Sequence, residues 1–492
     1  MKRISQYIKI MLVALSVNSV GGCNSWLDLQ PENKQTTDMF WKSKEEVEAV
    51  ITSGYNGLRS CLYYFVNWGE LRGDGLEIVY DYYGLETVKN LNILPTNGIC
   101  NWATVYATIG RANAVIRYAP EVLERDLTMT AEDLNGYLAE AVFIRSLCYF
   151  YLVRTYGEVP LILEPYIDDE RDYAVAKTGE AVVLAQLLED LNAYVGRAKE
   201  GYKVAWQKWG RATKWAMYAL MADIYLWQGD YEGVLSACGQ LEKGGFALLP
   251  KDEWYELYNP GNSKESIFEL QFSRDYGQQW GSYYLFYYSA TYDYHEYGPG
   301  SQSIDLFDEN PDDIRGSGGS YVGNRIWKYT GTKHAGQEGI ARTDIGYANW
   351  IVYRYAEILL MKAEALILSG ASHYGEAMDL VSQVRQRAGV RTIAVTPSTQ
   401  YEALQIVMNE RQRELLAEGK RWFDIMRMAK RNNWEYKEYL LSALLRDVPV
   451  RELAVWRNKL SDVNAYYLPV YDAEIKNSRG ALVQNSYYAG IQ

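Results

Sequence analysis

The sequence is poor in the residues from which metal sites are built. It holds three histidines in 492 residues, and these lie far apart at His295, His334 and His373. None of its five cysteines forms a Cys-x-x-Cys pair. Zinc sites gather histidine and cysteine ligands at short, regular spacings. The sequence therefore gives little support to zinc chemistry, and we expect no metal site.

The motifs of common nucleotide and hydrolase chemistry are also missing. The chain contains no GxSxG, no Walker phosphate loop, no HExxH and no GxGxxG. Its glycine-rich stretch 316–319 lacks the lysine and the strand–helix context of a phosphate loop. The formal charge is −12, whereas a nucleic-acid-binding surface normally needs a basic stripe. We expect no cofactor and no nucleic-acid partner.

Acidic residues gather in two places, and each has a simpler explanation than catalysis. The cluster Asp305, Asp308, Glu309, Asp312 and Asp313 lacks the order and the glycine of an EF-hand, so a solvated turn around Pro311 is favoured over a Ca²⁺ site. The second group alternates in sign at spacings of three and four residues, which places opposite charges on neighbouring helical turns. We predict an ion-pair lattice for this second group, because nearby arginines keep carboxylates ionised whereas a general acid needs a raised pKa. Its members are Glu410, Arg411, Arg413, Glu414, Glu418, Arg421, Asp424 and Arg427.

The N-terminus resembles a bacterial lipoprotein signal. Positive residues precede an apolar run over 10–17 that is too short to span a bilayer. The run leads to Val20-Gly21-Gly22-Cys23, in which two small residues precede a cysteine. We predict a signal peptide over 1–22 and a lipid anchor on Cys23. An ordinary secretory signal with an incidental cysteine is the alternative.

The other cysteines predict no cross-link with certainty. Cys148 and Cys238 lie in apolar helical patterns and fit small buried side chains. An exported protein would permit a disulfide between Cys61 and Cys100, and the sequence leaves that pairing open.

Helical periodicity dominates the rest of the chain. Apolar and small residues recur at spacings of three and four over 137–151, 215–226 and 353–367, and a glycine follows each segment. Further helices are predicted over 231–241, 374–388 and 401–417. Helix, glycine turn and helix over roughly 34 residues is the tetratricopeptide pattern. We predict a mainly α fold of about four such helix pairs, with unrelated amphipathic helices as the alternative.

Three long segments break this pattern. Residues 61–102, 244–350 and 431–490 are predicted as loops with short strands, one of them over 266–272. Long loops on a rigid scaffold commonly carry function.

Tyrosine is abundant where phenylalanine is scarce, with 44 tyrosines against 10 phenylalanines. Many of them crowd into 276–297 and 80–83, beside polar residues that include Gln278 and Gln279. Flat rings stack on sugar faces while polar side chains reach the hydroxyls, although such rings can also just pin loops to helices. The candidate ligand-binding residues are Arg72, Asp74, Tyr80, Tyr82, Tyr83, Asn101, Trp280, Tyr283, Tyr287, Tyr292 and Tyr294.

Several motifs in sequence order resemble the SusD/RagB family of Bacteroidetes outer-membrane lipoproteins. Trp26-Leu27-Asp28-Leu29-Gln30-Pro31 after Cys23 is similar to the opening of that family. The helix 354–365, then Glu410-Arg411-x-Arg413-Glu414-Leu415 and Leu468-Pro469-Val470, are similar to its later motifs. The resemblance covers essentially the whole chain, as one unit over 23–492 with an N-terminal part of about 24–230 and a C-terminal part of about 265–492.

The resemblance implies a function as well as a fold. It implies a non-enzymatic glycan-binding lipoprotein, anchored in the outer membrane and facing the exterior, that delivers nutrient to a SusC-like TonB-dependent transporter. A relative that captures peptide or glycoprotein, a helical-barrel glycoside hydrolase and a pure assembly scaffold are the alternatives.

Overall fold

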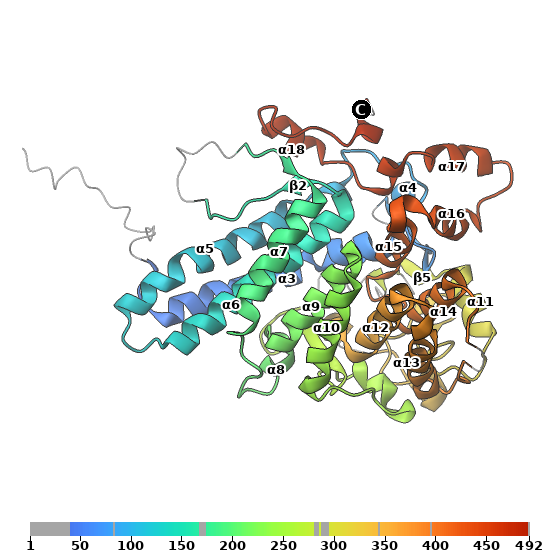
Figure 1. The fold of residues 1–492 in the computed structure, drawn as a ribbon, viewed down its shortest axis with the longest axis horizontal. Coiled ribbons are helices and arrows are strands. Elements are labelled where there is room, and N and C mark those ends of the chain that lie inside the picture. The colour runs from blue at the N-terminus through green and yellow to red at the C-terminus, as the bar shows by residue number, and fades with distance from the viewer. Residues whose placement is uncertain are drawn as a thin grey trace, which may run out of the picture.

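The computed structural model describes residues 40–81, 84–166, 174–279, 285–286, 295–342, 345–393 and 396–490. The predicted signal peptide and Cys23 lie outside these residues. Figure 1 shows a body of packed helices with loop-rich segments on one side. The helices are α3 (Lys44–Glu70), α4 (Leu85–Lys89), α5 (Ala103–Arg125), α6 (Ala131–Tyr156), α7 (Glu180–Val195), α8 (Gln207–Gly210), α9 (Lys214–Gln228), α10 (Tyr231–Leu241), α11 (Ser301–Asp308), α12 (Tyr355–Ser369), α13 (Tyr374–Arg387), α14 (Gln400–Glu414), α15 (Arg421–Trp434), α16 (Lys437–Leu445), α17 (Leu453–Lys459) and α18 (Asp472–Asn477).

The described strands are short and pair in twos. All four pairs are antiparallel: β1 (Leu76–Ile78) with β5 (Tyr297–Pro299), β2 (Val159–Pro160) with β3 (Lys177–Thr178), β4 (Ser266–Leu270) with β8 (Trp350–Arg354), and β6 (Tyr321–Val322) with β7 (Arg325–Ile326). The predicted strand at 266–272 is confirmed as β4. Because no pair extends into a larger sheet, packed helices supply most of the core.

Helix α6 forms the centre of the N-terminal half. It begins at a capping box in which Thr130 accepts from the Asp133 N–H and Asp133 accepts from the Thr130 N–H. It ends at Gly157, whose φ of 75° suits glycine. In the described residues it is the one helix long and apolar enough to cross a bilayer, and its apolar window is completely buried inside the protein. Helix α6 is therefore a core helix, packed between α3, α5 and α7.

The predicted tetratricopeptide-like pairs are present. Helix α9 is capped by Thr213 and ends at Gly229 with φ of 86°, and Asp230 then caps α10. Helices α12 and α13 are joined through Gly370 and a 3-10 turn over Ala371–His373, without a side-chain cap on α13. The two pairs pack against one another through α10 and α12. The prediction of a mainly helical fold is confirmed, and Figure 1 shows these pairs stacked beside the long helices α3, α5 and α6.

Two segments are more helical than predicted. Helix α3 continues to Glu70, so the predicted loop 61–102 begins ten residues late. The helix persists because Cys61, Leu62 and Phe65 continue its buried stripe. The segment 431–490 holds α16, α17 and α18 and no strand among its described residues, so the prediction of short strands there was wrong.

Four cysteines of the described chain are buried and unpaired. Cys61 lies beside the hydroxyl of Thr108 at 3.6 Å, whereas Cys100 faces the carbonyl of Leu94. The Cys61–Cys100 disulfide that the sequence left open is therefore absent from this structure.

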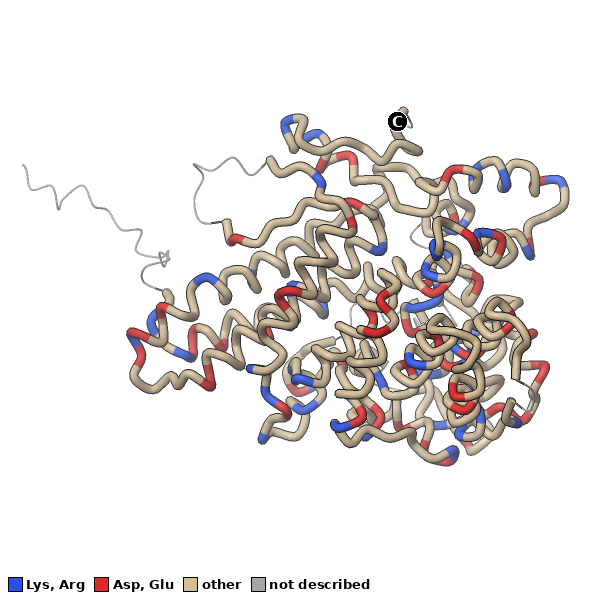
Figure 2. The backbone as a smooth tube through the Cα atoms, viewed as in Figure 1, with Lys and Arg blue, Asp and Glu red and all other residues tan. Residues whose placement is uncertain are grey.

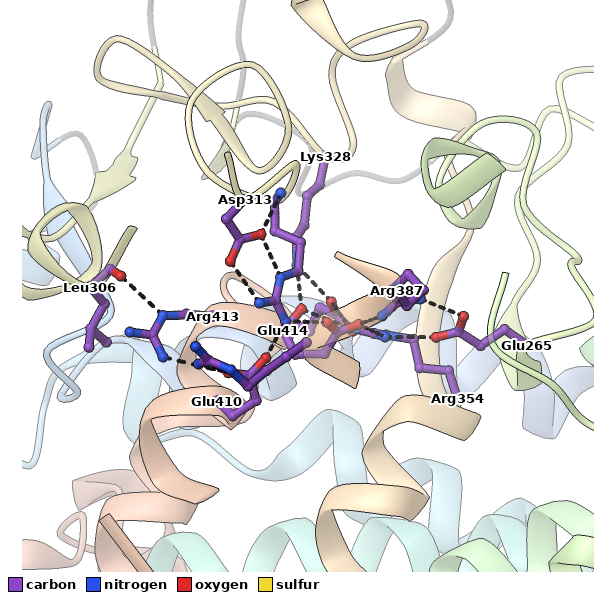
Figure 3. Close-up of polar contacts among 12 residues, drawn as sticks. Glu265, Leu306, Asp313, Lys328, Arg354, Arg387, Glu410, Arg413 and Glu414 are labelled. Carbon is purple, nitrogen blue, oxygen red and sulfur yellow. Dashed lines mark hydrogen bonds and ion pairs between the residues drawn. The ribbon is translucent and has the colours of Figure 1, made fainter. Parts of the chain in front are cut away.

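The predicted ion-pair lattice is confirmed, and it lies deep in the C-terminal half (Figure 3). Glu414 at the end of α14 is its centre, contacted by the guanidinium groups of Arg315 at 2.7 Å and Arg354 at 2.5 Å and by Arg387. Most of its partners come from distant parts of the sequence. We call the following residues the lattice: Glu265, Asp313, Arg315, Lys328, Arg354, Arg387, Glu410, Glu414 and Glu418.

Arg411, Asp424 and Arg427 of the predicted group form a neighbouring buried cluster, whereas Arg413 pairs with Glu309 and Arg421 with Asp74. Arg411 pairs with Asp424 at 2.8 Å, and Arg427 contacts both Asp424 at 2.9 Å and Glu364 of α12 at 2.8 Å. These pairs connect α12, α14 and α15. Figure 2 shows acidic and basic positions interleaved along the helices, not separated by sign.

Candidate ligand-binding groove

A polar groove of about 740 Å³ lies against the outer face of α3. One wall of the groove is the polar stripe of this amphipathic helix, whose residues recur every three to four positions. Thr52, Asn56 and Ser60 on that stripe are exposed, whereas Ile51, Tyr55 and Leu58 on the opposite side are buried. The helix therefore presents hydroxyl and amide groups to solvent along one wall of a hollow.

The other wall is a tight turn that follows β4. Gln278 N–H donates to the Ser273 carbonyl at 2.9 Å, and Gly277 N–H donates to Arg274 at 3.1 Å. The turn starts from Phe272, which is buried and whose N–H donates to Asn349. It carries Tyr276, whose side chain is 77% exposed. An open aromatic ring thus projects beside the amides of Gln278 and Gln279.

The charge of this groove is slight. Arg59 donates to the Asn56 side chain at 3.1 Å and to the Gln271 carbonyl at 3.4 Å, and partial burial lowers the pKa of its guanidinium. Among the described lining residues no carboxylate is present. Hydroxyls, amides, one arginine and one exposed ring are groups that hydrogen-bond to and stack on an uncharged, hydroxyl-rich ligand.

The chain from this turn leads towards the second group of aromatic residues. Strand β5 at its far end pairs with β1, and Ile78 lies opposite Tyr297. One step further along, the rings of Tyr80 and His295 meet edge to face with centroids 6.0 Å apart. Tyr80 and His295, the described residues of the two tyrosine-rich segments at this point, therefore meet at one end of the β1–β5 pair.

Several candidate residues have structural partners. Arg72 is buried, donates to the Tyr466 carbonyl and stacks over Trp422 at 4.3 Å. Asp74 pairs with Arg421 at 2.5 Å. Asn101 caps α5 by accepting from the Ala103 N–H at 2.8 Å. These contacts place Arg72 and Asp74 inside the fold and Asn101 at a helix start.

Of the other candidate residues, Tyr80 is described by the structure. Tyr80 is 44% exposed at the β1–β5 end. The remaining candidates lie outside the described residues and stay predictions. They are Tyr82, Tyr83, Trp280, Tyr283, Tyr287, Tyr292 and Tyr294.

The groove also contains residues that were not among the candidates. Thr52, Asn56 and Arg59 lie on a helix that the sequence analysis did not examine for function. Their signal is the spacing of small polar residues along one face of α3. Tyr276, Gln278 and Gln279 belong to the predicted aromatic segment without being candidates, and they line the groove as well.

A second hollow, of about 950 Å³, lies along α5. It is lined by small residues and aromatic rings of α5, with walls from 160–166, from Ala174 and Val175, and from the C-terminal segment 474–482. Glu474 is the one carboxylate among its described lining residues. Glycoside hydrolysis needs two carboxyl groups facing one bond. Neither hollow provides such a pair among the lining residues that the structure describes.

Comparison with protein families accounts for most of the chain. A model described as "SusD family" matches residues 286–488, and one described as "Starch-binding associating with outer membrane" matches residues 25–226. The chain belongs to the SusD family. SusD-like protein P38 of Formosa agariphila is 25% identical over 87% of this chain and 93% of its own. A SusD-like protein of Bacteroides ovatus is 23% identical over 90% and 88%.

Solved structures of SusD proteins share this fold. A SusD superfamily protein of Bacteroides thetaiotaomicron superposes with a TM-score of 0.73 at 20% identity, covering 92% of this chain and all of the other. A protein described as a laminarin-binding SusD-like protein gives a TM-score of 0.67 at 23% identity, over 90% of this chain and 99% of the other. The SusD fold is thus present along nearly the whole chain.

Proposed function

We propose that this SusD-family protein is a non-catalytic glycan-binding lipoprotein of the outer membrane. The observation that carries the proposal is the α3 groove, where the exposed ring of Tyr276 stands beside Gln278, Gln279 and the polar stripe of α3. Such a groove suits a chain of sugars, whose C–H faces stack on rings and whose hydroxyls bond to amides. A relative of the same fold is described as laminarin-binding, which supports the same ligand class.

A non-catalytic role agrees with the state of the carboxyl groups. Burial raises the pKa of Glu70 to about 8, a value suited to a general acid. Its side chain is fully buried, however, and lies on neither hollow. In the lattice, Glu414 and Glu418 are buried as well, and neighbouring arginines lower the pKa of both carboxyl groups. A substrate in either groove would therefore meet no pair of catalytic carboxyl groups among the described residues.

Removing the ring of Tyr276 should weaken glycan binding. We expect Tyr276→Ala to bind an oligosaccharide about three- to tenfold more weakly, because one stacked ring contributes roughly 0.5–1.5 kcal/mol beyond its buried area. Isothermal titration against a panel of neutral polysaccharides, laminarin included, measures the change. The predicted residues Tyr83 and Trp280 are tested in the same panel by substitution with alanine.

The matched control is Tyr166→Ala. Tyr166 is also exposed, at 54%, but it lines the α5 hollow instead of the α3 groove. Unchanged affinity in this variant, with weakened binding in Tyr276→Ala, supports the α3 groove as the glycan site. Equal affinity of Tyr276→Ala and the unaltered protein would contradict it, and release of shortened products from labelled oligosaccharides would contradict a non-catalytic role.

The location and partner follow from the same proposal. The lipoprotein signal ending at Cys23 would tie the body to the outer membrane, facing the exterior, and a SusC-like TonB-dependent transporter would receive the glycan. Purification from membranes tests this prediction: the transporter should copurify with the lipidated protein, and Cys23→Ser should release the body into the soluble fraction. A Cys23→Ser protein that remains membrane-bound would contradict the anchor.

A further inference from the structure

Helices α3 and α6 run side by side in the same direction through the core. Near the start of α3 the Tyr55 hydroxyl donates to Glu140 of α6 at 2.6 Å. Further along both helices the rings of Phe65 and Tyr151 stack with centroids 3.8 Å apart. These two contacts are almost equally far apart along each helix, so the helices stay in register between them. Each helix carries one cysteine within this stretch.

These two cysteines, Cys61 on α3 and Cys148 on α6, are neighbours in one buried chain of hydrogen bonds. Both side chains are completely buried. The Thr108 hydroxyl of α5 donates to the Thr104 carbonyl at 2.9 Å, so its oxygen is the acceptor for the Cys61 thiol 3.6 Å away. Burial raises the pKa of the Cys148 thiol well above its ordinary value, and a hydrogen bond with Cys61 raises it further. The two thiols are therefore in contact.

The other two described cysteines have different neighbours. The Cys100 thiol lies 3.9 Å from the Leu94 carbonyl, and the Cys238 thiol lies 3.9 Å from the Ile358 carbonyl. A disulfide needs two cysteines whose side chains point towards one another across a short distance. Among the described cysteines, only the pair on α3 and α6 meets this requirement.

We propose that Cys61 and Cys148 form a disulfide between α3 and α6 when the chain folds in the presence of a disulfide oxidant. The helices approach closely at this point, because a Cβ at Gly54 would lie 3.1 Å from the Ile144 Cδ1 atom. The proposal is independent of glycan binding, since the pair lies on the buried side of α3, whereas the groove lies on its exposed side.

The reaction is a thiol–disulfide exchange with an oxidant such as oxidised glutathione. One thiolate attacks the oxidant and forms a mixed disulfide, and the second thiolate then displaces the remaining glutathione thiol. An Sγ–Sγ bond forms in the protein, and the two thiol hydrogens with their electrons end on two molecules of reduced glutathione. The protein is oxidised by two electrons, and the oxidant is reduced by two.

Burial decides when this exchange can occur. Only a thiolate attacks a disulfide. In the folded protein both thiols are out of reach of an oxidant, and the raised pKa of Cys148 keeps that thiol protonated. In the unfolded chain both cysteines are open to solvent. The bond should therefore form while α3 and α6 come together, and burial should then protect it from reductants.

Refolding from urea in reduced and oxidised glutathione tests the cross-link, in the mature chain with Cys23→Ser so that four cysteines remain. We expect thiol titration in denaturant to find two free thiols, and the mass to fall by two hydrogen atoms. Proteolytic fragments that contain Cys61 and Cys148 should stay joined until they are reduced. The oxidised protein should also unfold at a higher urea concentration than the reduced protein, because the bond restricts the unfolded chain.

Single cysteine variants supply the controls. Cys61→Ser and Cys148→Ser should each refold with all three remaining thiols free. Cys238→Ser is the matched control, because it also removes a buried helical cysteine, and it should retain the cross-link and one free thiol. The same measurements on chain secreted into an oxidising periplasm, with thiols alkylated at harvest, avoid dependence on refolding. Four free thiols in both preparations, or a fragment that joins Cys61 to Cys100, would overturn the proposal.

Discussion

Replacing Glu414 with glutamine is expected to lower the free energy of unfolding by about 3–5 kcal/mol, the cost of removing one partner from a buried ion pair. The side chain of Glu414 accepts from three guanidinium groups, those of Arg315, Arg354 and Arg387. Glutamine keeps the volume and removes the negative charge. The three arginines would then stay buried without a compensating negative charge, and the interior offers no water to solvate them.

The electrostatics of the site agree with the direction of this effect. Burial alone would raise the pKa of Glu414, but Arg387, Arg354 and Arg315 lower it well below the ordinary value of a glutamate. The same balance lowers the pKa of Glu418 to about 2, with Arg354 and Lys328 as its charged partners. The folded state therefore depends on the ionised form of both carboxyls.

Urea unfolding followed by circular dichroism measures the loss. The control is Glu121→Gln, which removes an ion pair with Arg117 on the exposed face of α5. An exposed pair four residues apart on a helix contributes only about 0.3–0.5 kcal/mol. A Glu414→Gln protein that unfolds at the same urea concentration as Glu121→Gln would show that the lattice does not stabilise the fold.

The second large effect concerns Glu70, and its size depends on pH. We expect Glu70→Gln to stabilise the protein above neutral pH, by up to about 5 kcal/mol at pH 9. Burial raises the pKa of Glu70 from 4.5 to about 8, because the end of α3 is packed tightly against the turn at Gly419. A Cβ at Gly69 would lie 1.9 Å from the Gly419 carbonyl oxygen, so the contact leaves no room for water.

The sign of this change in stability depends on which protonation state of Glu70 the folded protein favours. Glu70 Oε1 accepts from the backbone N–H groups of Gly419 and Lys420, while Oε2 meets no donor among the described residues. The folded state thus favours the protonated acid. The stabilisation from protonated Glu70 is complete below the unfolded pKa of 4.5 and is lost as the pH rises through about 8. Glutamine resembles the protonated acid at every pH.

Unfolding by urea at pH 5, 7 and 9 measures this difference. The advantage of Glu70→Gln over the unaltered protein should be small at pH 5 and grow steadily towards pH 9. Glu45→Gln serves as the control, because Glu45 is an exposed carboxyl on the same helix and its substitution should give a constant difference over this range. A constant difference for Glu70→Gln as well would contradict the raised pKa.

The helices were predictable where local signals decide them. The periodicity of 215–226 and the turn at Gly229 fixed α9, because helix, C-cap and next N-cap are all encoded within about 20 residues. The end of α3 was missed for a different reason. Its residues Tyr63, Tyr64 and Trp68 fall in the segment 61–102 that was predicted as loop, yet Trp68 is buried and donates to the Ile99 carbonyl at 2.9 Å.

The lattice shows the limit of short-range spacing more clearly. The spacing of Glu410, Glu414 and Glu418 predicted paired charges, and they are paired. The arginines that pair with Glu414 come from residues 27 to 99 positions away. Only the folded chain brings them together, so no helical spacing could identify them. For the same reason Arg72 and Asp74, predicted for a ligand, have buried partners at Trp422 and Arg421.

The sequence predicted an aromatic ligand surface, but it predicted only some of the segments that form the candidate groove. The tyrosine-rich segment after β4 indicated an aromatic surface, and Tyr276 is exposed there. Its partner wall is α3, more than 200 residues earlier in the chain. Polar residues on the solvent side of an amphipathic helix look the same in sequence whether or not another segment folds over them. Only the tertiary arrangement distinguishes a ligand-binding surface from an ordinary solvent-exposed helix face.

The attachment of the tyrosine-rich segment has a consequence for the diversity of such proteins. The segment begins at Phe272, bonded to Asn349, and ends at Tyr297, whose hydroxyl donates to Asn67, and between them Phe286 is buried against Trp350. Every residue of the lattice lies outside these two ends. The stretch between them can therefore vary in length and sequence around the buried Leu285 and Phe286 while the buried charges stay in register. The same scaffold can in this way acquire new binding specificities through changes in this one segment. Phe272 and Tyr297 give protein engineers two fixed positions between which to make such changes.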